Sequence, residues 1–454
     1  MFKSLQTNEK LILVFFYFIA LQPLIDVLTT FMIVQLEMSA TIGVLVRVLF
    51  MGISALFLLI NWKTSRIAKF SVIYLIAWGI FLILNIGISY MYKPVFIAGE
   101  EIKYLVKLSY FNVILLNFVF IFRYFSKNLQ LSKLLFQNIM VAALIYGLIM
   151  LISISTGTAL NSYGWHKIGF SGWFFAGNEL GASLSMILPI VLYIAITKTE
   201  SFKQVYYWLP VVLVSFSLIM IGTKVGFGAV AGTLLVGLVS LLIALVSKKE
   251  HRGNLKVSAI ITLILLAIVG ATTPISPVYQ NTYTHVYLIM EEEKQQNEEP
   301  PEDEAVEEEP ETDTSRLNNL ILSNRDLFLV QQREYYSEAP LAQKIAGMGY
   351  AGNFEEAPKM IEMDYSDVFY STGIIGTLLY FLPFLYFAIS AIRRLLKNVK
   401  SIFLPHHAMF ISSIVLGLGI AHFAGHVFTA PGVSIFLAII TAYFYHYVKE
   451  NEFV

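Results

Sequence analysis

The chain has 454 residues, of which 57% are hydrophobic and 14% are charged, a composition that excludes a soluble multidomain protein of this length. So large an apolar excess needs lipid around it, and we expect a polytopic membrane protein. The formal net charge is zero, but residues 291–313 hold 13 of the 31 acidic residues, so the rest of the chain is basic. The sequence has no cysteine, which excludes disulfides and thiolate chemistry.

Twelve apolar runs are long enough to cross about 30 Å of hydrocarbon as helices, which predicts an all-α membrane protein. They lie near residues 11–34, 41–61, 70–92, 104–122, 134–154, 178–197, 205–223, 225–247, 256–272, 367–391, 405–428 and 431–448. The first run resembles a secretory signal but is too long and contains Asp26, so we expect a retained span. The seventh and eighth runs meet at Gly222, where one long bent helix is the alternative to a tight turn.

The distribution of Lys and Arg predicts the orientation, because positively charged loops stay in the cytoplasm. A cytoplasmic N-terminus puts 19 of the 31 basic residues on the inner side, and twelve spans return the C-terminus there. We therefore expect nine spans in residues 1–272, an extracytoplasmic loop at 273–366, and three spans in 367–454. Within the loop, the composition of 291–313 predicts a disordered spacer, with a cation or wall-polymer contact as the alternative.

Ionisable residues near or inside spans are candidates for pairing or function, because each costs free energy in lipid. Asp26 in the first span and Arg47 in the second lie near the same outer side, so we expect an ion pair, with a substrate role as the alternative. His422 and His426 are four residues apart in the eleventh predicted span and would share a helix face. Without a third ligand at motif distance, we favour helix packing or a hydrogen bond to substrate over a metal site.

A second group of charges follows the third span. Lys103 and Lys107 are one helical turn apart and come just after Glu100 and Glu101. All four would line one outer vestibule, and the alternative is that the lysines extend to the membrane interface.

Several cations fall at the outer surface in this topology, where a substrate in the outer leaflet would arrive. They are Lys224, Arg316, Arg325 and Arg333. A pyrophosphate needs several fixed cations, since Arg offers planar bidentate donors and Lys a point charge. Plain surface charge is the alternative, above all for Arg333. The glycine-rich turn at 347–353 predicts a flexible elbow where backbone can approach a ligand.

Two carboxylates stand just before the tenth span. Glu362 and Asp364 are two residues apart in a predicted extended or turn segment. Either carboxylate can take the proton from an acceptor hydroxyl, so both are candidate catalytic bases.

Five local patterns in the second half of the chain, taken in order, resemble the O-antigen ligase and O-antigen polymerase family of membrane glycosyltransferases. Phe174 to Ala182, with Asn178, resembles its Pro-Asn-x-x-Ala at the start of a span, and Gly222 to Gly226 resembles its Thr-x-Ser-Arg-Gly turn with Lys224 in place of Arg. Ser323 to Arg325 resembles its Ser-x-Arg, with Ser315-Arg316 as a competing register, and Gly347 to Tyr350 resembles its Gly-x-Gly. Glu362 to Gly376 has the spacing of its His-Asn-x9-Gly-x-x-Gly signature, but Glu362 stands at the His position and Met363 at the Asn position.

The resemblance implies a metal-independent and cofactor-free glycosyltransferase of the bacterial cytoplasmic membrane that binds no nucleic acid. Its donor would be a glycan on undecaprenyl pyrophosphate, held by Lys224, Arg325 and Arg316, while Glu362 or Asp364 activates the acceptor. The further candidate substrate-binding residues are Tyr365, Asn178, Trp165, Trp173, Lys103 and Lys107. The acceptor is a second lipid-linked glycan in a polymerase or another surface polymer in a ligase, and we favour the polymerase.

A transporter or flippase for the same lipid-linked glycan is the main alternative. It predicts charged or helix-breaking features near the bilayer midplane. The polar candidates gather on the predicted outer side instead, which favours an enzyme. A non-catalytic scaffold would leave Arg325 and Glu362 without a purpose.

Overall fold

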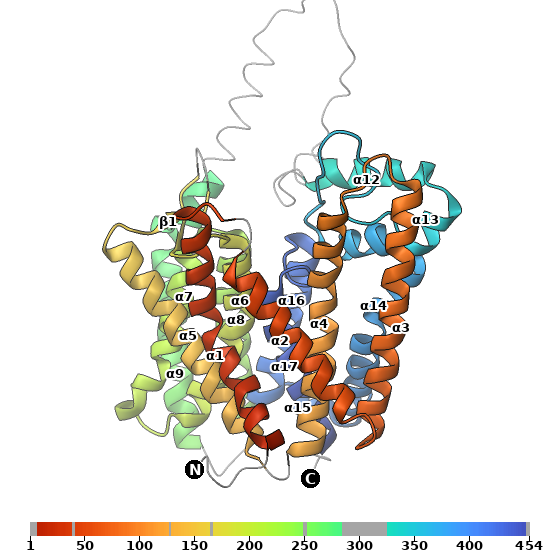
Figure 1. The fold of residues 1–454 in the computed structure, drawn as a ribbon. Helices are drawn as coiled ribbons and strands as arrows, with labels where there is room; N and C mark the ends of the chain where they lie inside the picture. The colour runs from red at the N-terminus through yellow and green to blue at the C-terminus, as the bar shows by residue number, and fades with distance from the viewer. Residues whose placement is uncertain are drawn as a thin grey trace, which may run out of the picture.

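The computed structural model describes residues 7–38, 41–126, 129–163, 167–247, 252–283 and 325–450. Its long helices run between two faces of a single bundle (Figure 1). Helices α1 and α17 respectively begin and end at one face, which we call the terminus face. Helices α12 and α13 lie at the opposite face, the site face.

Within the described residues, twelve helical segments are long and apolar enough to cross a membrane, which confirms the all-α class and the twelve predicted spans. The spans are α1 (Thr7–Val34), α2 (Ile42–Ile60), α3 (Arg66–Tyr92), α4 (Ala98–Phe125), α5 (Leu131–Ser155), α6 (Gly177–Lys198), η2 with α7 (Phe202–Trp208 and Leu209–Ile221), α8 (Lys224–Ser247), α9 (Arg252–Thr272) with η3 (Thr273–Ile275), α14 (Asp364–Leu395) with η4 (Leu396–Asn398) and α15 (Val399–Ile402), α16 (Pro405–Phe423) and α17 (Pro431–Glu450). Outside the spans, the described residues include a two-stranded antiparallel hairpin, β1 (Leu160–Asn161) and β2 (Phe170–Gly172), and the helices α12 (Arg325–Glu338) and α13 (Leu341–Ala346).

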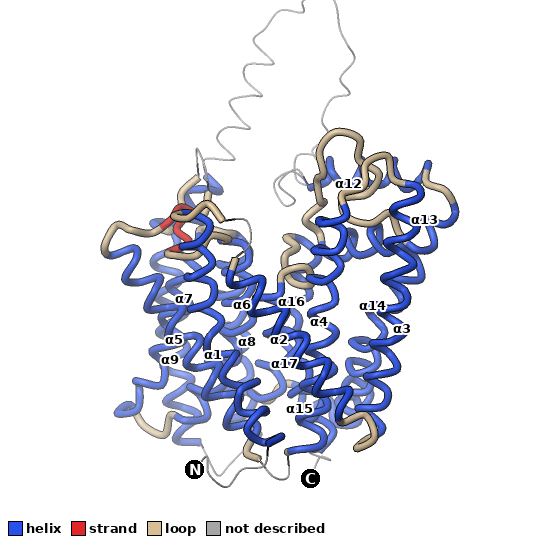
Figure 2. Tube along the Cα trace, in the orientation of Figure 1, coloured by secondary structure: helices blue, strands red, loops and turns tan. Residues whose placement is uncertain are grey.

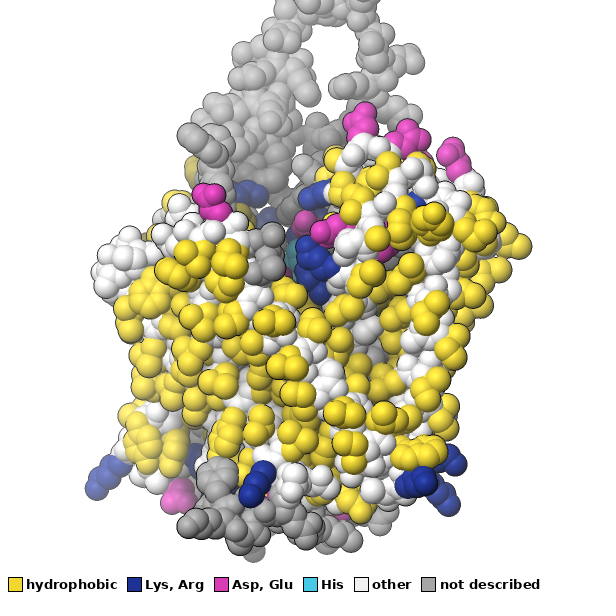
Figure 3. Space-filling model, in the orientation of Figure 1, with side chains coloured by type: hydrophobic (Ala, Val, Ile, Leu, Met, Phe, Trp, Pro, Cys, Tyr) yellow, Lys and Arg dark blue, Asp and Glu magenta, His cyan; other side chains and the backbone are white. Residues whose placement is uncertain are grey.

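Three spans form the centre of the bundle. The side chains of α4, α6 and α17 are almost all buried, whereas α2, α3 and α9 expose many apolar side chains. Aromatic rings fill the contacts of α4, as where Phe122 meets Tyr443 of α17 edge to face. The exposed apolar side chains form a broad band between the two faces, and loops are confined to the faces (Figures 2 and 3). This band has the character of a surface in contact with lipid tails.

A left-handed glycine separates the seventh and eighth spans. Gly222 has φ +79° after the end of α7, and a Cβ there would approach the Ile168 carbonyl oxygen to 2.5 Å. The hydroxyl of Thr223 then accepts a hydrogen bond from Gly226 N–H (3.0 Å) at the start of α8. The two spans are therefore separate helices, and the alternative of one long bent helix is wrong.

Helix α14 is interrupted at Gly373, whose φ of +65° and ψ of −170° are not helical. Another loop uses the backbone of α14 just before this break. Met348 N–H donates to the Tyr370 carbonyl (2.9 Å), and Gly349 N–H donates to the Ser371 carbonyl (3.0 Å). The turn that begins at Gly347 and the break of α14 at Gly373 thus form one packed unit.

The turn at 347–353 is fixed from its other side by a buried ion pair. Lys93 and Glu101 pair with each other, and both bind Tyr350, whose carbonyl accepts from Lys93 Nζ (2.6 Å) and whose N–H donates to Glu101 (2.7 Å). The prediction of a flexible elbow is therefore wrong, because the backbone groups of the turn are bonded to α14 and to the α3–α4 corner. Glu101 is buried in its pair with Lys93, so the prediction that it lines a vestibule with Lys103 is also wrong.

We expect Gly373→Ala to lower the unfolding free energy by about 2–4 kcal/mol, because a Cβ strains the left-handed backbone and would meet Gly347 N at 2.5 Å. Thermal unfolding of the purified protein, followed by tryptophan fluorescence, measures the change. Gly419→Ala is the matched control, since nothing lies within 4 Å of its added Cβ, and it should not lower the melting temperature. Equal shifts in the two variants would contradict the packing argument.

Candidate functional site

A hollow opens on the site face, and basic, acidic and histidine side chains lie on its walls (Figure 3). Four residues from three separate segments meet there, and we call them the cleft cluster: Arg325, Lys359, Glu362 and His426. Arg325 begins α12, Lys359 and Glu362 precede α14, and His426 follows α16.

Glu362 lies at the centre of the cleft cluster. Its carboxylate is 3.4 Å from Arg325 Nη2, 3.3 Å from Lys359 Nζ and 3.7 Å from His426 Nε2. The Glu362 side chain keeps 33% of its surface exposed, so a substrate can reach it. The cluster therefore presents one accessible carboxylate surrounded by three nitrogen groups.

The cluster's electrostatics follow from these contacts. The ion pair with His426, helped by the charges of Lys359 and Arg325, lowers the pKa of Glu362 to about 2 against the effect of burial. Burial acts to lower the pKa of His426, but Glu362, with smaller contributions from Glu179 and Asp364, outweighs it and the pKa is raised. Glu362 is thus ionised at neutral pH, and both members of the pair are charged at pH values well below the raised pKa of His426.

Unusual backbone conformations aim both members of this pair. Glu362 has φ +64° and His426 has φ +59°, values that non-glycine residues seldom adopt. Gly425, also left-handed, approaches the backbone of Glu362 so closely that a Cβ would meet its carbonyl oxygen at 2.5 Å. Such strain persists only where surrounding contacts enforce it.

Those contacts come from two buried carboxylates in the first turn of α14. Asp364 accepts hydrogen bonds from the N–H groups of His426 (3.1 Å), Val427 (2.7 Å) and Phe428 (2.8 Å) and from the Thr429 hydroxyl (2.9 Å). In the same way, Asp367 accepts from the N–H groups on either side of Glu362, at 3.0 and 3.1 Å. Asp364 is 1% exposed, so this predicted base faces protein donors rather than the hollow.

Lys224 and Lys167 form a second group of cations. Lys224 starts α8 and lies within electrostatic range of Lys167. The ammonium of Lys167 is 5.8 Å from the ring centre of Tyr163, and burial raises the pKa of Tyr163 against the opposing charge of Arg325. Lys167 and Tyr163 thus lie between Lys224 and Arg325 in a series of electrostatic contacts.

Lys103 and Lys107 line a different space, a cavity of about 620 Å³ between α1, α2, α4, the start of α6 and the start of α17. We call it the α2–α4 cavity. Glu100 forms an ion pair with Lys103 (3.2 Å) and does not itself line the cavity. The predicted vestibule therefore exists for the two lysines alone.

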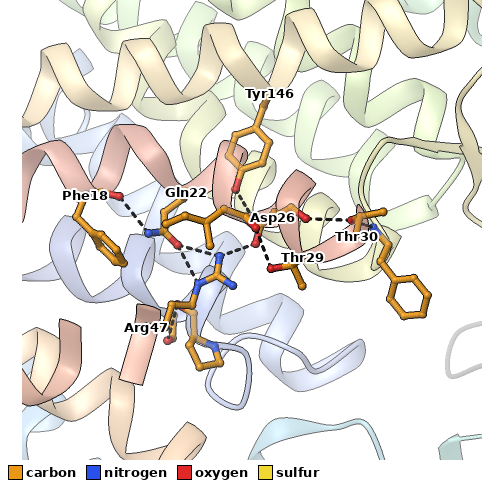
Figure 4. A network of polar contacts seen from close by, with 11 residues as sticks. Phe18, Gln22, Asp26, Thr29, Thr30, Arg47 and Tyr146 are labelled. Carbon is orange, nitrogen blue, oxygen red and sulfur yellow. Dashed lines mark hydrogen bonds and ion pairs between the residues drawn. The ribbon is translucent and has the colours of Figure 1, made fainter. Parts of the chain in front are cut away.

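The predicted ion pair of Asp26 with Arg47 is confirmed and lies in the wall of this cavity (Figure 4). Arg47 also donates twice to Gln22 Oε1, each time at 3.0 Å. Tyr146 of α5 donates its hydroxyl to the second oxygen of Asp26 at 2.9 Å. Three spans are thus joined by one polar network inside the membrane region, where unpaired charges are costly.

Other predicted site residues are not members of the cleft cluster. Tyr365 packs among Phe381, His422 and Phe428, and Trp173 donates to the Thr158 hydroxyl (2.9 Å). Asn178 is the second residue of α6, and its side chain is exposed. Arg316, Trp165 and the acidic segment 291–313 lie outside the described residues.

The prediction that His422 and His426 share a helix face is wrong. Helix α16 ends at Phe423, and Gly425 turns the chain before His426. The sequence also gave no reason to single out Lys359 and Lys167, or to pair His426 with a residue 64 positions earlier. The one local sign was the Gly425-His426 step, because glycine after an apolar run favours the end of a helix.

Comparison with known proteins adds a family to this geometry. Residues 8–451 match the family described as O-antigen ligase like membrane protein. No curated protein matches the sequence. The match spans essentially the whole chain, including all twelve membrane-spanning segments and the cleft cluster. The chain therefore belongs to the O-antigen ligase like family of membrane proteins, whose members act on lipid-linked glycans in surface polysaccharide assembly.

Proposed function

We propose that the protein transfers a glycan from undecaprenyl pyrophosphate to an acceptor hydroxyl on the outer face of the bacterial cytoplasmic membrane. The observation that carries this proposal is the cleft cluster, in which an accessible ionised carboxylate lies beside an arginine and a lysine. Of the two activities open to the family, we favour the polymerase, in which the acceptor is a second lipid-linked glycan, over the ligase.

In the proposed reaction, Glu362 takes the proton from the acceptor hydroxyl as its oxygen forms a bond to the anomeric carbon of the donor. The bond from that carbon to the pyrophosphate oxygen breaks, and the pyrophosphate leaves with the electron pair. A carboxylate already ionised at neutral pH can act as this base without first losing a proton.

The leaving group gains negative charge as the bond breaks, and fixed cations stabilise it. Arg325, with its planar fork of donors, is the proposed first ligand of the pyrophosphate, and Lys224 the second. Lys167 adds positive charge near Lys224 and Tyr163, which supports the same assignment.

Asp364 has a different role in this proposal. Four protein donors already occupy its two oxygens, so accepting a substrate proton would break hydrogen bonds that hold the His426 loop. We therefore assign proton transfer to Glu362 and the positioning of His426 to Asp364.

The proposed orientation puts the site face outside and both ends of the chain in the cytoplasm, because Lys and Arg are concentrated in the loops of the terminus face. A surface site suits a donor whose glycan projects from the outer leaflet. The cleft cluster lies outside the membrane-spanning segments, which supports surface chemistry over transport through the bilayer.

We expect Glu362→Gln to reduce transfer by about 10²- to 10⁴-fold, because glutamine keeps the shape but cannot accept the proton. The assay gives purified protein a lipid-linked oligosaccharide and measures chain length. The matched control is Glu334→Gln, an exposed carboxylate on α12, which should transfer at the wild-type rate. Full activity of Glu362→Gln would overturn the assignment.

The same assay separates the two forms of the reaction. Longer chains formed from the lipid-linked oligosaccharide alone identify a polymerase. Product that appears only after a second kind of acceptor is added identifies a ligase.

The pH dependence of the rate tests the role of Glu362 independently. Since its pKa is about 2, Glu362 should impose no acid limb between pH 5 and pH 8. In Glu362→His the base has an ordinary pKa of about 6.5, so any residual rate should fall as the pH drops below that value. Identical pH profiles in the two proteins would contradict proton transfer at position 362.

A further inference from the structure

The α2–α4 cavity opens toward the lipid and is not part of the cleft cluster. Val44 and Val48 of α2 and Ile102 of α4 line it, and these side chains are 43%, 41% and 52% exposed within the apolar band. An apolar chain in the membrane can reach the cavity along this rim without crossing water. The volume of about 620 Å³ is within the range of sites that bind organic ligands.

The inner wall of the cavity carries a buried hydroxyl with nothing to bind. Tyr110 of α4 is 1% exposed, and among the described residues its hydroxyl has no hydrogen-bond partner. A buried hydroxyl without a partner is unfavourable, and a bound polar group that hydrogen-bonds to it would remove the cost. The Arg47–Asp26 pair lies in the same wall, with Gln22 and Tyr146 completing its hydrogen bonds (Figure 4).

Cations lie above this wall, toward the site face. Lys107 lines the cavity one turn from Tyr110 on α4 and forms no hydrogen bond or ion pair with the part of the chain that the structure describes. Lys103 lies one turn further toward the site face and shares its charge with Glu100. An anionic headgroup is therefore the natural match for the polar end, and a hydrocarbon chain for the rim.

The cavity also adjoins the cleft cluster. Its wall includes Ala430 and the first turn of α17, which directly follow the loop that contains His426. Glu179, another wall residue, lies within electrostatic range of both Lys107 and His426. A ligand headed by an anion at Lys107 would therefore have its polar end directed to the hollow that contains Glu362.

We infer that the α2–α4 cavity binds the lipid phosphate of a second polyprenyl-linked glycan, the acceptor, while the donor pyrophosphate lies at Arg325 and Lys224. This inference rests on the proposed transferase function and assigns it to the polymerase form. The acceptor hydroxyl loses its proton to Glu362, its oxygen joins the donor sugar, and the donor polyprenyl pyrophosphate departs. The acceptor keeps its own lipid throughout.

Binding of polyprenyl phosphate to the full-length protein in nanodiscs, measured by native mass spectrometry, tests the site directly. Lys107→Ala should weaken binding about ten- to a hundredfold, and Tyr110→Phe about two- to tenfold, from the usual worth of charged and neutral hydrogen bonds. Tyr74→Phe is the matched control, because Tyr74 is also buried with an unpaired hydroxyl among the described residues but does not line the cavity. Polyprenol, which has no phosphate, should bind equally to wild type and Lys107→Ala.

A transfer assay with two acceptors then separates the acceptor site from the donor site. Lys107→Ala should raise the KM for a lipid-linked acceptor by a much larger factor than the KM for a lipid-free glycan. The inference would be overturned if Lys107→Ala lost the same share of transfer with both acceptors. It would also be overturned if Lys107→Ala bound polyprenyl phosphate as tightly as the wild type does. If the wild type transfers no glycan at all, the proposed function fails, and the binding series alone then decides whether the cavity is a lipid phosphate site.

Discussion

The buried carboxylate of Asp364 holds together the two segments from which the cleft cluster is built. It lies two residues after Glu362 and accepts hydrogen bonds from four consecutive residues that begin with His426. Burying an unpaired carboxylate costs several kcal/mol, so four donors in good geometry make this arrangement strongly preferred over alternatives that lose them. Because the last two spans and the tenth span meet at this one group, the distance between Glu362 and His426 is fixed by the fold rather than by the flexibility of two loops.

Arg325 reaches the cluster through a longer chain of contacts. Gln332, a buried residue of α12, donates to the Ala351 carbonyl at 2.8 Å. The turn that contains Ala351 is bonded to the break in α14 and to the buried pair of Lys93 and Glu101. A helix that lies outside the bilayer is in this way tied to three membrane spans, and the arginine at its first position acquires a defined place opposite Glu362.

The spans and the Asp26–Arg47 pair were predictable because both follow from rules that act over short distances or over whole segments. Hydrophobic length defines a span, and a charge inside lipid needs a partner. The contact between Glu362 and His426 depends instead on where α16 stops, and apolar composition continues past that point to residue 428. Asp364 resembled a catalytic base for the same reason, since its hydrogen-bond donors come from residues more than sixty positions later.

The departure of this chain from the family signature has a physical consequence at the cleft cluster. Where the resemblance expects histidine, Glu362 adds a negative charge that a neutral imidazole would not bring. That charge is offset on three sides, by Arg325, by Lys359 three residues before it in the sequence, and by His426 from another loop. An imidazole is thus still present beside position 362, but as a partner of the carboxylate. The sequence change and the three nitrogen groups are parts of one electrostatic arrangement, in which removing the carboxylate would leave the cations Arg325 and Lys359 without the negative charge that lies between them.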